Sequence, residues 1–179
     1  SAWNGGALLA SHDFGHGHID AHAAVRLAES WMSLGTVANL VLEQGKVTQP
    51  TLTVHAGQQA AATASFAAPY RLEQMTVTVD IEADALEALI IELISPDGVV
   101  SELMNMPVLA EAQDDDDFDF DFNDDGEDDA DEHSLHYTFN TVLNWGSDLA
   151  GEWTLKVTNA LDEGTIQLNN WSLLAYTAG

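Results

Sequence analysis

The clearest hydrophobic pattern in the chain lies near its C-terminus. Apolar residues occupy every second position in the run 153–157, and Ile166 and Leu168 repeat the spacing after a polar stretch, residues 159–164. Alternation with period two is typical of a strand with one buried face, so this region predicts a β-hairpin. The apolar run 171–176 continues the second strand and is rich enough in Trp, Leu and Tyr to lie deep in a sandwich or barrel.

Similar short runs recur from residue 51 onward and are bounded by turns such as Ser-Pro-Asp-Gly at 95–98. Alternation is strictest in 75–81, where Met, Val, Val and Ile alternate with polar residues. Besides the C-terminal pair, the predicted strands are 51–54, 61–66, 73–81, 89–94, 99–103 and 137–143. Seven or eight strands after a single helix predict an all-β antiparallel sandwich with Greek-key connections, with a β-barrel as the alternative.

The N-terminal part has a different pattern. Residues 1–17 contain four Gly and predict irregular structure, whereas Asp20 is placed to cap a helix. Helical spacing links Ala21, Ala24, Val25, Ala28 and Trp31, and Gly35 follows. A helix of roughly three turns is not stable alone in water, so we expect it to dock against something larger. Residues 35–50 are interpreted as a linker with one short strand at 38–42.

Composition narrows the range of partners. Four Lys and Arg against 30 Asp and Glu give a net charge of −26, which disfavours nucleic acid and anionic membranes and favours cations. The chain has no Cys, so it forms neither a disulfide nor a thiolate metal site. No apolar run reaches the ~20 residues of a membrane span, and the N-terminus lacks the basic start and apolar stretch of a signal peptide.

Several stretches carry a recognisable set of motifs. They are residues 4–7, 11–21 (SHDFGHGHIDA), 24–25 and 28–31, then 90–98 (IIELISPDG), and then 137–140 (YTFN), 144–146 (NWG), 151–158 (GEWTLKVT) and 170–173 (NWSL). The first group resembles the end of the catalytic domain of kexin and furin-type subtilisin-like serine proteases. The others resemble the P domain, or Homo B domain, of these proprotein convertases. The resemblance implies a jelly-roll-like antiparallel β-sandwich preceded by one N-terminal helix.

The same resemblance implies a division of the chain and a role for it. Residues 1–34 correspond to the catalytic-domain tail and its last helix, 35–50 to the linker, and 51–179 to the P domain with an acidic insertion at 111–132. The family's Gly-Thr-Ser nucleophile motif does not occur, so no catalytic residue is assigned. The expected function is to stabilise the catalytic domain of a secreted or cell-surface bacterial endopeptidase, that domain being the partner. The alternative is an independent protein- or carbohydrate-binding module.

The acidic insertion has a chemistry of its own. Fourteen of the 22 residues from 111 to 132 are Asp or Glu, and none is Lys or Arg. Residues 121–132 match the EF-hand loop template, in which alternate oxygen ligands precede a Gly and a Glu closes the shell. The chain is therefore expected to bind calcium as its cofactor, and the alternative is a solvated acidic run. The candidate metal ligands are Asp119, Asp121, Asn123, Asp125, Glu127 and Glu132.

Other side chains suggest weaker alternatives. His12, His16, His18 and His22 span eleven residues and offer imidazoles to zinc, although ordinary surface histidines have the same spacing. Trp faces on a β-sandwich suit glycan binding. The strand patterns and family motifs instead place Trp145, Trp153 and Trp171 in the core or between the sheets.

Overall fold

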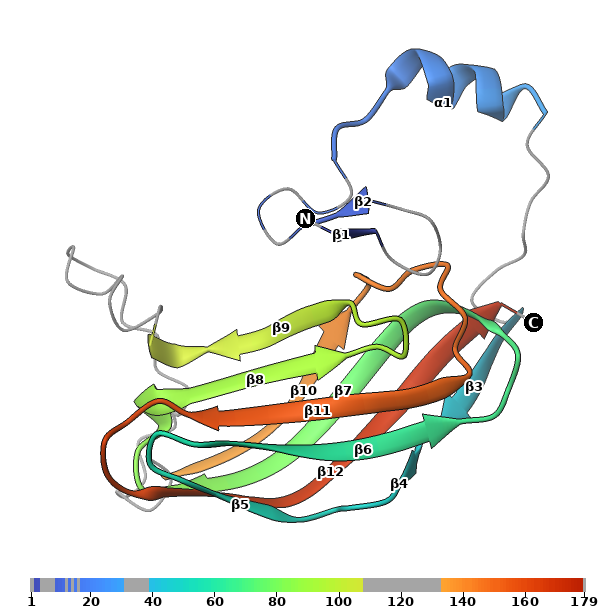
Figure 1. Ribbon diagram of the computed structural model, residues 1–179. Coiled ribbons are helices and arrows are strands. Elements are labelled where there is room, and N and C mark those ends of the chain that lie inside the picture. The colour runs from blue at the N-terminus through green and yellow to red at the C-terminus, as the bar shows by residue number, and fades with distance from the viewer. Residues whose placement is uncertain are drawn as a thin grey trace, which may run out of the picture.

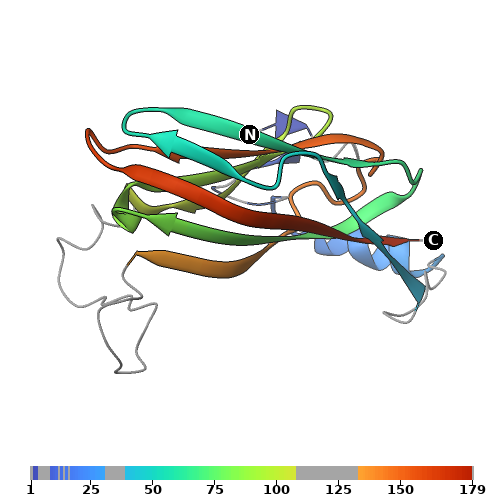
Figure 2. The ribbon, with the colours of Figure 1, turned by 90° about the horizontal axis from the view of Figure 1, so that it is seen from below.

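The computed structural model describes residues 2–3, 9–11, 13, 15, 17–30, 39–107 and 133–178. Its main body is a sandwich of two five-stranded antiparallel sheets with a shared apolar interior (Figures 1 and 2). A single α-helix precedes the sandwich among these residues. The predicted all-β, jelly-roll-like sandwich with an N-terminal helix is therefore confirmed.

The first sheet has the order β10-β7-β12-β3, and β5 also pairs with β12. All of its pairings are antiparallel, and the longest strand, β12, lies beside three partners. Its strands are β10 (Ser134–Thr141), β7 (Arg71–Ala83), β12 (Thr165–Ala178), β3 (Leu40–Gln44) and β5 (Leu52–His55).

The second sheet has the order β4-β6-β11-β8-β9 and is also antiparallel throughout. A short 3₁₀ helix, η2 (Leu86–Ala88), leads from the first sheet into β8. The strands of the second sheet are β4 (Lys46–Val47), β6 (Gln59–Phe66), β11 (Gly151–Asn159), β8 (Leu89–Ile94) and β9 (Val100–Asn105).

The strands β3 and β4 lie within residues 35–50, the segment interpreted as a linker. β3 pairs with β12 in one sheet and β4 pairs with β6 in the other, so the chain crosses between the sheets at Gly45. A Cβ at Gly45 would lie 3.0 Å from Phe66 Cζ and 3.1 Å from Leu173 Cβ. Only glycine fits this crossing without displacing its neighbours. The division of the chain into domains stays a prediction, but residues 40–47 contribute strands to the sandwich.

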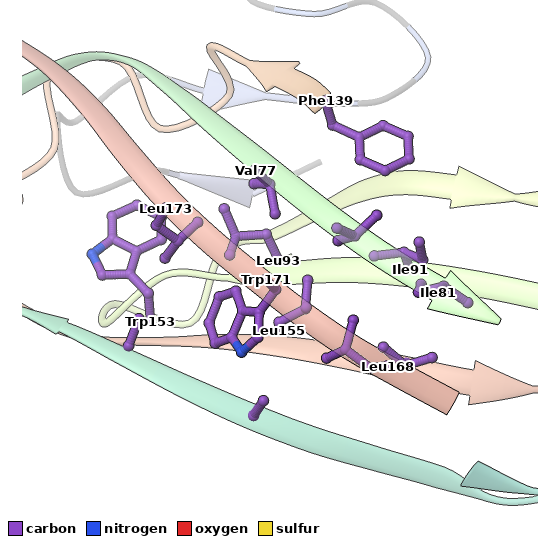
Figure 3. Close-up of a cluster of buried hydrophobic side chains, with 14 of the residues drawn as sticks. Val77, Ile81, Ile91, Leu93, Phe139, Trp153, Leu155, Leu168, Trp171 and Leu173 are labelled. Carbon is purple, nitrogen blue, oxygen red and sulfur yellow. The ribbon is translucent and has the colours of Figure 1, made fainter. Parts of the chain in front are cut away.

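The core follows from the alternation along the strands (Figure 3). Strand β7 buries the predicted apolar side of 75–81 completely, and β8 and β11 do the same from the opposite sheet. Trp153, at 0% exposure, and Trp171, at 2%, both lie in this interior. Each indole nitrogen donates to a backbone carbonyl, Trp153 Nε1 to Leu149 O at 3.0 Å and Trp171 Nε1 to Gln49 O at 2.9 Å. Burial of both rings therefore leaves neither N–H unsatisfied.

The predicted C-terminal hairpin is wrong. β11 pairs with β6 and β8, whereas β12 pairs with β7, β3 and β5, so these consecutive strands lie in different sheets. Their buried faces oppose each other across the core, and residues 160–164 form an arch between the sheets. Alternation shows which face of a strand is buried, but it does not show which strand supplies the hydrogen bonds.

A register shift in β12 lets both of its halves face the core. Ile166 and Leu168 are buried at even positions, whereas Trp171 and Leu173 are buried at odd ones. The pairing of β12 with β7 shifts between Leu168 and Asn170, as at a β-bulge. One extra residue reverses the side to which all later side chains point, so the bulge keeps the apolar run inside.

Candidate functional site

The helix α1 (Ala21–Ala28) is built as the sequence predicts at its start. Asp20 is extended at the N-cap, and its side chain accepts a hydrogen bond from Ala23 N at 2.9 Å. This bond satisfies one of the N–H groups that the first turn leaves without a helical partner. Arg26 and Glu29 lie 3.9 Å apart as an exposed ion pair near the other end. The helix is two turns long, shorter than the three turns expected.

No residue of α1 is buried. Ile19, just before the helix, is 92% exposed, Val25 is 64% exposed and Leu27 is 56% exposed. The predicted stripe at Ala21, Ala24, Val25 and Ala28 therefore lies in solvent, while Trp31 is outside the described residues. Figure 1 shows the helix standing away from the sheets. The described part of the chain thus supplies no core for this helix.

A second exposed feature is the loop after β10, residues 142–150, which we call the β10–β11 loop. Backbone bonds hold it to the start of β7: Gly146 N donates to Leu72 O at 2.7 Å, and Leu72 N donates to Ser147 O at 2.9 Å. Arg71 adds a bond from Nη1 to Gly146 O at 2.9 Å. These contacts give the loop a defined position at one end of the sandwich.

Trp145 in this loop departs from the prediction of a core role. Its side chain is 46% exposed, and its Nε1 donates to Glu73 Oε2 at 2.7 Å. The neighbouring Val142 is 55% exposed, whereas Asn144 is only 1% exposed. Apolar composition did not distinguish Trp145 from the buried Trp153 and Trp171. The signal that distinguishes it is its place in a turn-rich stretch rather than in an alternating run.

The six candidate calcium ligands, Asp119, Asp121, Asn123, Asp125, Glu127 and Glu132, lie outside the described residues. Their assignment therefore stays a prediction. In the part of the chain that the structure describes, no three His, Asp or Glu side chains are grouped closely enough to hold a metal ion. Of the histidines considered for zinc, His18 and His22 are exposed, and His12 and His16 are outside the described residues. Over the same described ranges, no helix has the length and apolar character needed to cross a membrane.

Comparison with known proteins gives these features a context. The family model of the proprotein convertase P-domain matches residues 72–175. This span covers β7 to β12 and hence the central strands of both sheets.

Several proteases are similar to this chain in sequence. Protease KEX1 of Kluyveromyces lactis is 31% identical over 174 residues, which cover 91% of this chain and 20% of that protein. Kexin of Saccharomyces cerevisiae is 27% identical over 91% of this chain, and furin of Mus musculus is 30% identical over 97% of it. The chain thus spans about a fifth of the length of these relatives.

Solved structures support the fold. The serine protease of Aeromonas sobria matches 98% of this chain and 33% of its own with a TM-score of 0.68 at 21% identity. The complex of that protease with the chaperone ORF2 gives a TM-score of 0.72 over 99% of this chain and 33% of the matched chain, again at 21% identity. The two-sheet fold and the family match over residues 72–175 agree, and the chain belongs to the proprotein convertase P-domain family of kexin and furin-type proteases.

Proposed function

We propose that this chain is the non-catalytic P domain of a secreted or cell-surface bacterial subtilisin/kexin-like serine endopeptidase, with residues 1–34 forming the tail of the catalytic domain. Its function is to stabilise that catalytic domain. The observation that carries the proposal is α1, whose eight residues are all exposed in this chain.

The physical reason is the marginal stability of short helices. Helices below about 12–15 residues rarely persist in water without tertiary packing, and α1 has eight. Burying Val25 and Leu27 on a partner would contribute about 1.5–3 kcal/mol for each side chain if burial were complete. The catalytic domain is the partner that fits, because the relatives that carry this type of domain are proteases about five times as long as the matched region.

The experiment compares the intact protease with a truncated form that lacks residues 45–179. We expect the truncated form to fold poorly or to lose peptidase activity at a modest temperature at which the intact form keeps it. Thermal melts and residual activity after heating provide the readouts. An unaffected truncated protease would contradict the stabilising function.

Reading the coding sequence upstream of Ser1 separates the proposal from the alternative of an independent protein- or carbohydrate-binding module. A protease predicts Asp, His and Gly-Thr-Ser motifs in that region, in positions suited to a catalytic triad. An unrelated upstream region would favour the independent module.

We further propose that the acidic insertion binds calcium. The supporting observation is the donor set: Asp119, Asp121, Asn123 and Asp125 place oxygen donors at alternate positions. Gly126 permits the bend that such a loop requires, and Glu132 is placed to give two further oxygens. Calcium prefers six to eight oxygen ligands, and this segment offers them at high density.

Calorimetry of the full chain with calcium, before and after chelator treatment, tests this second proposal. We expect saturable binding tighter than millimolar, weakened by Asp121→Ala and by Asp125→Ala. Asp162→Ala, in the exposed arch between β11 and β12, is the matched control and should leave binding unchanged. Binding no tighter than millimolar in the parent chain would rule calcium out as a specific ligand.

A further inference from the structure

Among the described residues, β9 and β10 are edge strands of the two sheets, and they lie beside each other along one side of the sandwich. At one end of this side, Ser101 Oγ accepts from Thr141 Oγ1 at 3.4 Å and from Asn144 Nδ2 at 3.3 Å. Toward the other end, where β9 finishes and β10 begins, the side chains enclose a groove of about 180 Å³. The side where β9 and β10 meet is thus bonded at one end and has a groove at the other.

Apolar side chains from both sheets line most of this groove. Met104 and Leu135 form its buried floor, with exposures of 9% and 7%, and Leu86 and Met106 are half-buried. Tyr137 forms part of the wall and is 46% exposed, with its ring 4.8 Å from that of Phe139. Methionine side chains adapt to ligands of different shape, so this groove suits an inserted apolar side chain.

Beside the groove runs a backbone edge that is open to pairing. β10 is eight residues long and, among the described residues, pairs with β7 alone. The register of that pairing continues without a bulge from Ser134 to Thr141. The strand contains no Lys, Pro or Gly, which are residues that commonly protect an edge strand from a further partner. Its outer N–H and C=O groups can therefore accept another strand.

An acidic hollow lies at the start of the same strand. It has a volume of about 590 Å³ and shares Ser134 with the apolar groove. Glu82 and Asp84 contribute carboxylates to it. Asp84 Oδ2 accepts from Thr165 N at 2.7 Å and from Thr165 Oγ1 at 3.1 Å, whereas Glu82 is exposed. Glu82 is the carboxylate better placed to meet a basic side chain.

We propose that β10 binds an extended segment of another protein as an additional antiparallel strand, with an apolar side chain in the groove and a Lys or Arg beside Glu82. Backbone hydrogen bonds supply affinity in this mode of recognition, and the pockets for alternate side chains supply specificity. β10 runs away from the acidic hollow, and Glu82 lies on the face of the sheet opposite to Leu135, so an antiparallel segment carries its basic residue about one or three positions C-terminal to the apolar one.

The negative net charge of the chain favours a basic segment over a second copy of the chain as the partner of β10. Each copy carries a net charge of −26, so two copies repel each other as they approach edge to edge. A basic segment is attracted by the same field. Binding of a segment to β10 does not depend on the proposed stabilisation of a catalytic domain. An experiment that contradicts one of these two proposals therefore leaves the other intact.

The test uses the full chain and a dye-labelled, acetylated and amidated octapeptide in which Thr alternates with Val or Leu before two C-terminal Lys. We expect saturable binding by fluorescence anisotropy. A peptide with N-methyl groups on alternate backbone amides, on the side that pairs, should bind at least about tenfold more weakly, because it loses edge hydrogen bonds. Replacing the two Lys with Glu should weaken binding severalfold.

Matched variants of the chain locate the site. Tyr137→Glu places a carboxylate in the groove and should weaken binding about tenfold, while Leu42→Glu, at a 57% exposed position on the opposite edge of the same sheet, should leave it unchanged. Glu82→Gln should weaken binding of the Lys peptide about threefold, and Glu152→Gln on the other sheet should not. Each variant is first checked for an unchanged thermal melt, and Met106→Ser is the second groove variant.

Absence of saturable binding by the Lys peptide would overturn the proposal, as would equal binding of the N-methylated peptide. Equal effects of Tyr137→Glu and Leu42→Glu would show that the peptide binds elsewhere and would overturn it as well. Sedimentation that shows the chain to be a dimer, dissociated by Tyr137→Glu, would assign the edge to a second copy instead.

Discussion

The sandwich and the helix α1 have apolar periodicities of similar clarity in the sequence, but only one of them is satisfied within the chain. In the sandwich, Val77, Leu155 and Leu173 lie between the sheets with 0% exposure. In α1, Val25 and Leu27 are more than half exposed. A periodic apolar face indicates that an element packs against a partner, and the structure shows whether the same chain supplies that partner.

The chain thus combines a sandwich that has its own apolar core with a helix that has no buried residue. The interior of the sandwich is formed by strands that are far apart in sequence, such as β7 and β12, which pair over most of their length. The helix precedes that unit and has no buried residue. Substitutions in the sandwich should therefore change the stability of this chain, whereas substitutions in α1 should change the stability of the molecule against which the helix packs.

The largest expected effect is in the core. Trp153→Ala removes a fully buried indole and its hydrogen bond to Leu149 O, so we expect a loss of about 3–5 kcal/mol in the free energy of unfolding. Trp145→Ala is the control, because its ring is 46% exposed, and should cost about 1 kcal/mol. Urea denaturation measures both. Equal losses in the free energy of unfolding would mean that the difference in burial between Trp153 and Trp145 does not determine the cost of the substitution.

The next effect concerns the crossing between the sheets. Gly45→Ala places a methyl group 3.0 Å from Phe66 Cζ, so we expect a loss of about 1–3 kcal/mol in the free energy of unfolding. Phe66→Leu makes room for it, so the double variant should lose less than the sum of the single ones. A double-mutant cycle from urea melts provides the measurement. Strict additivity would show that the Phe66 ring does not limit this position.

A smaller effect is expected where the end of β7 meets the start of β12. Asp84→Ala removes the acceptor for Thr165 N and Thr165 Oγ1 at an exposed site, which should cost about 1 kcal/mol in the free energy of unfolding. Asp162→Ala, in the neighbouring arch, serves as the control and should change it by less than about 0.5 kcal/mol. A thermal melt that does not distinguish the two variants would contradict the anchoring role of Asp84.

The smallest effect on the chain itself is expected in α1. The double substitution Val25→Ser and Leu27→Ser should change the free energy of unfolding of the 179-residue chain by less than about 0.5 kcal/mol, because neither side chain is buried in it. In the intact protease the same substitutions should lower the Tm of the catalytic domain. Differential scanning calorimetry of both proteins shows whether the helix stabilises the sandwich or its partner.

Alternation predicted the buried faces of the strands correctly and their neighbours incorrectly. The apolar positions of 75–81, 153–157 and 166–168 are all in the core. β11 and β12, expected as a hairpin, are instead in opposite sheets. A polar connection of a few residues can form a tight turn within one sheet or an arch between two, and its composition is similar in both cases.

The functional assignments also differ in how far the sequence predicted them. The motifs and the resemblance identified the family, and the match over residues 72–175 confirms it. The calcium ligands were inferred from their spacing, and they lie outside the described residues, so that inference stays a prediction. The groove beside β10 was not predicted at all. Its residues come from 86, 104–106 and 134–137, which are distant in sequence and have no shared motif.

The sequence by itself determined the fold class and the buried side of nearly every strand, because side-chain polarity and period are local properties of the chain, and its motifs indicated the family by resemblance. Only the tertiary structure decided which strands share a sheet, that Trp145 is partly exposed while Trp153 is buried, and that β10, within the described part of the chain, pairs on one side only. Those features depend on contacts between distant segments, and such contacts form from the geometry of the whole sandwich rather than from the pattern of any one strand.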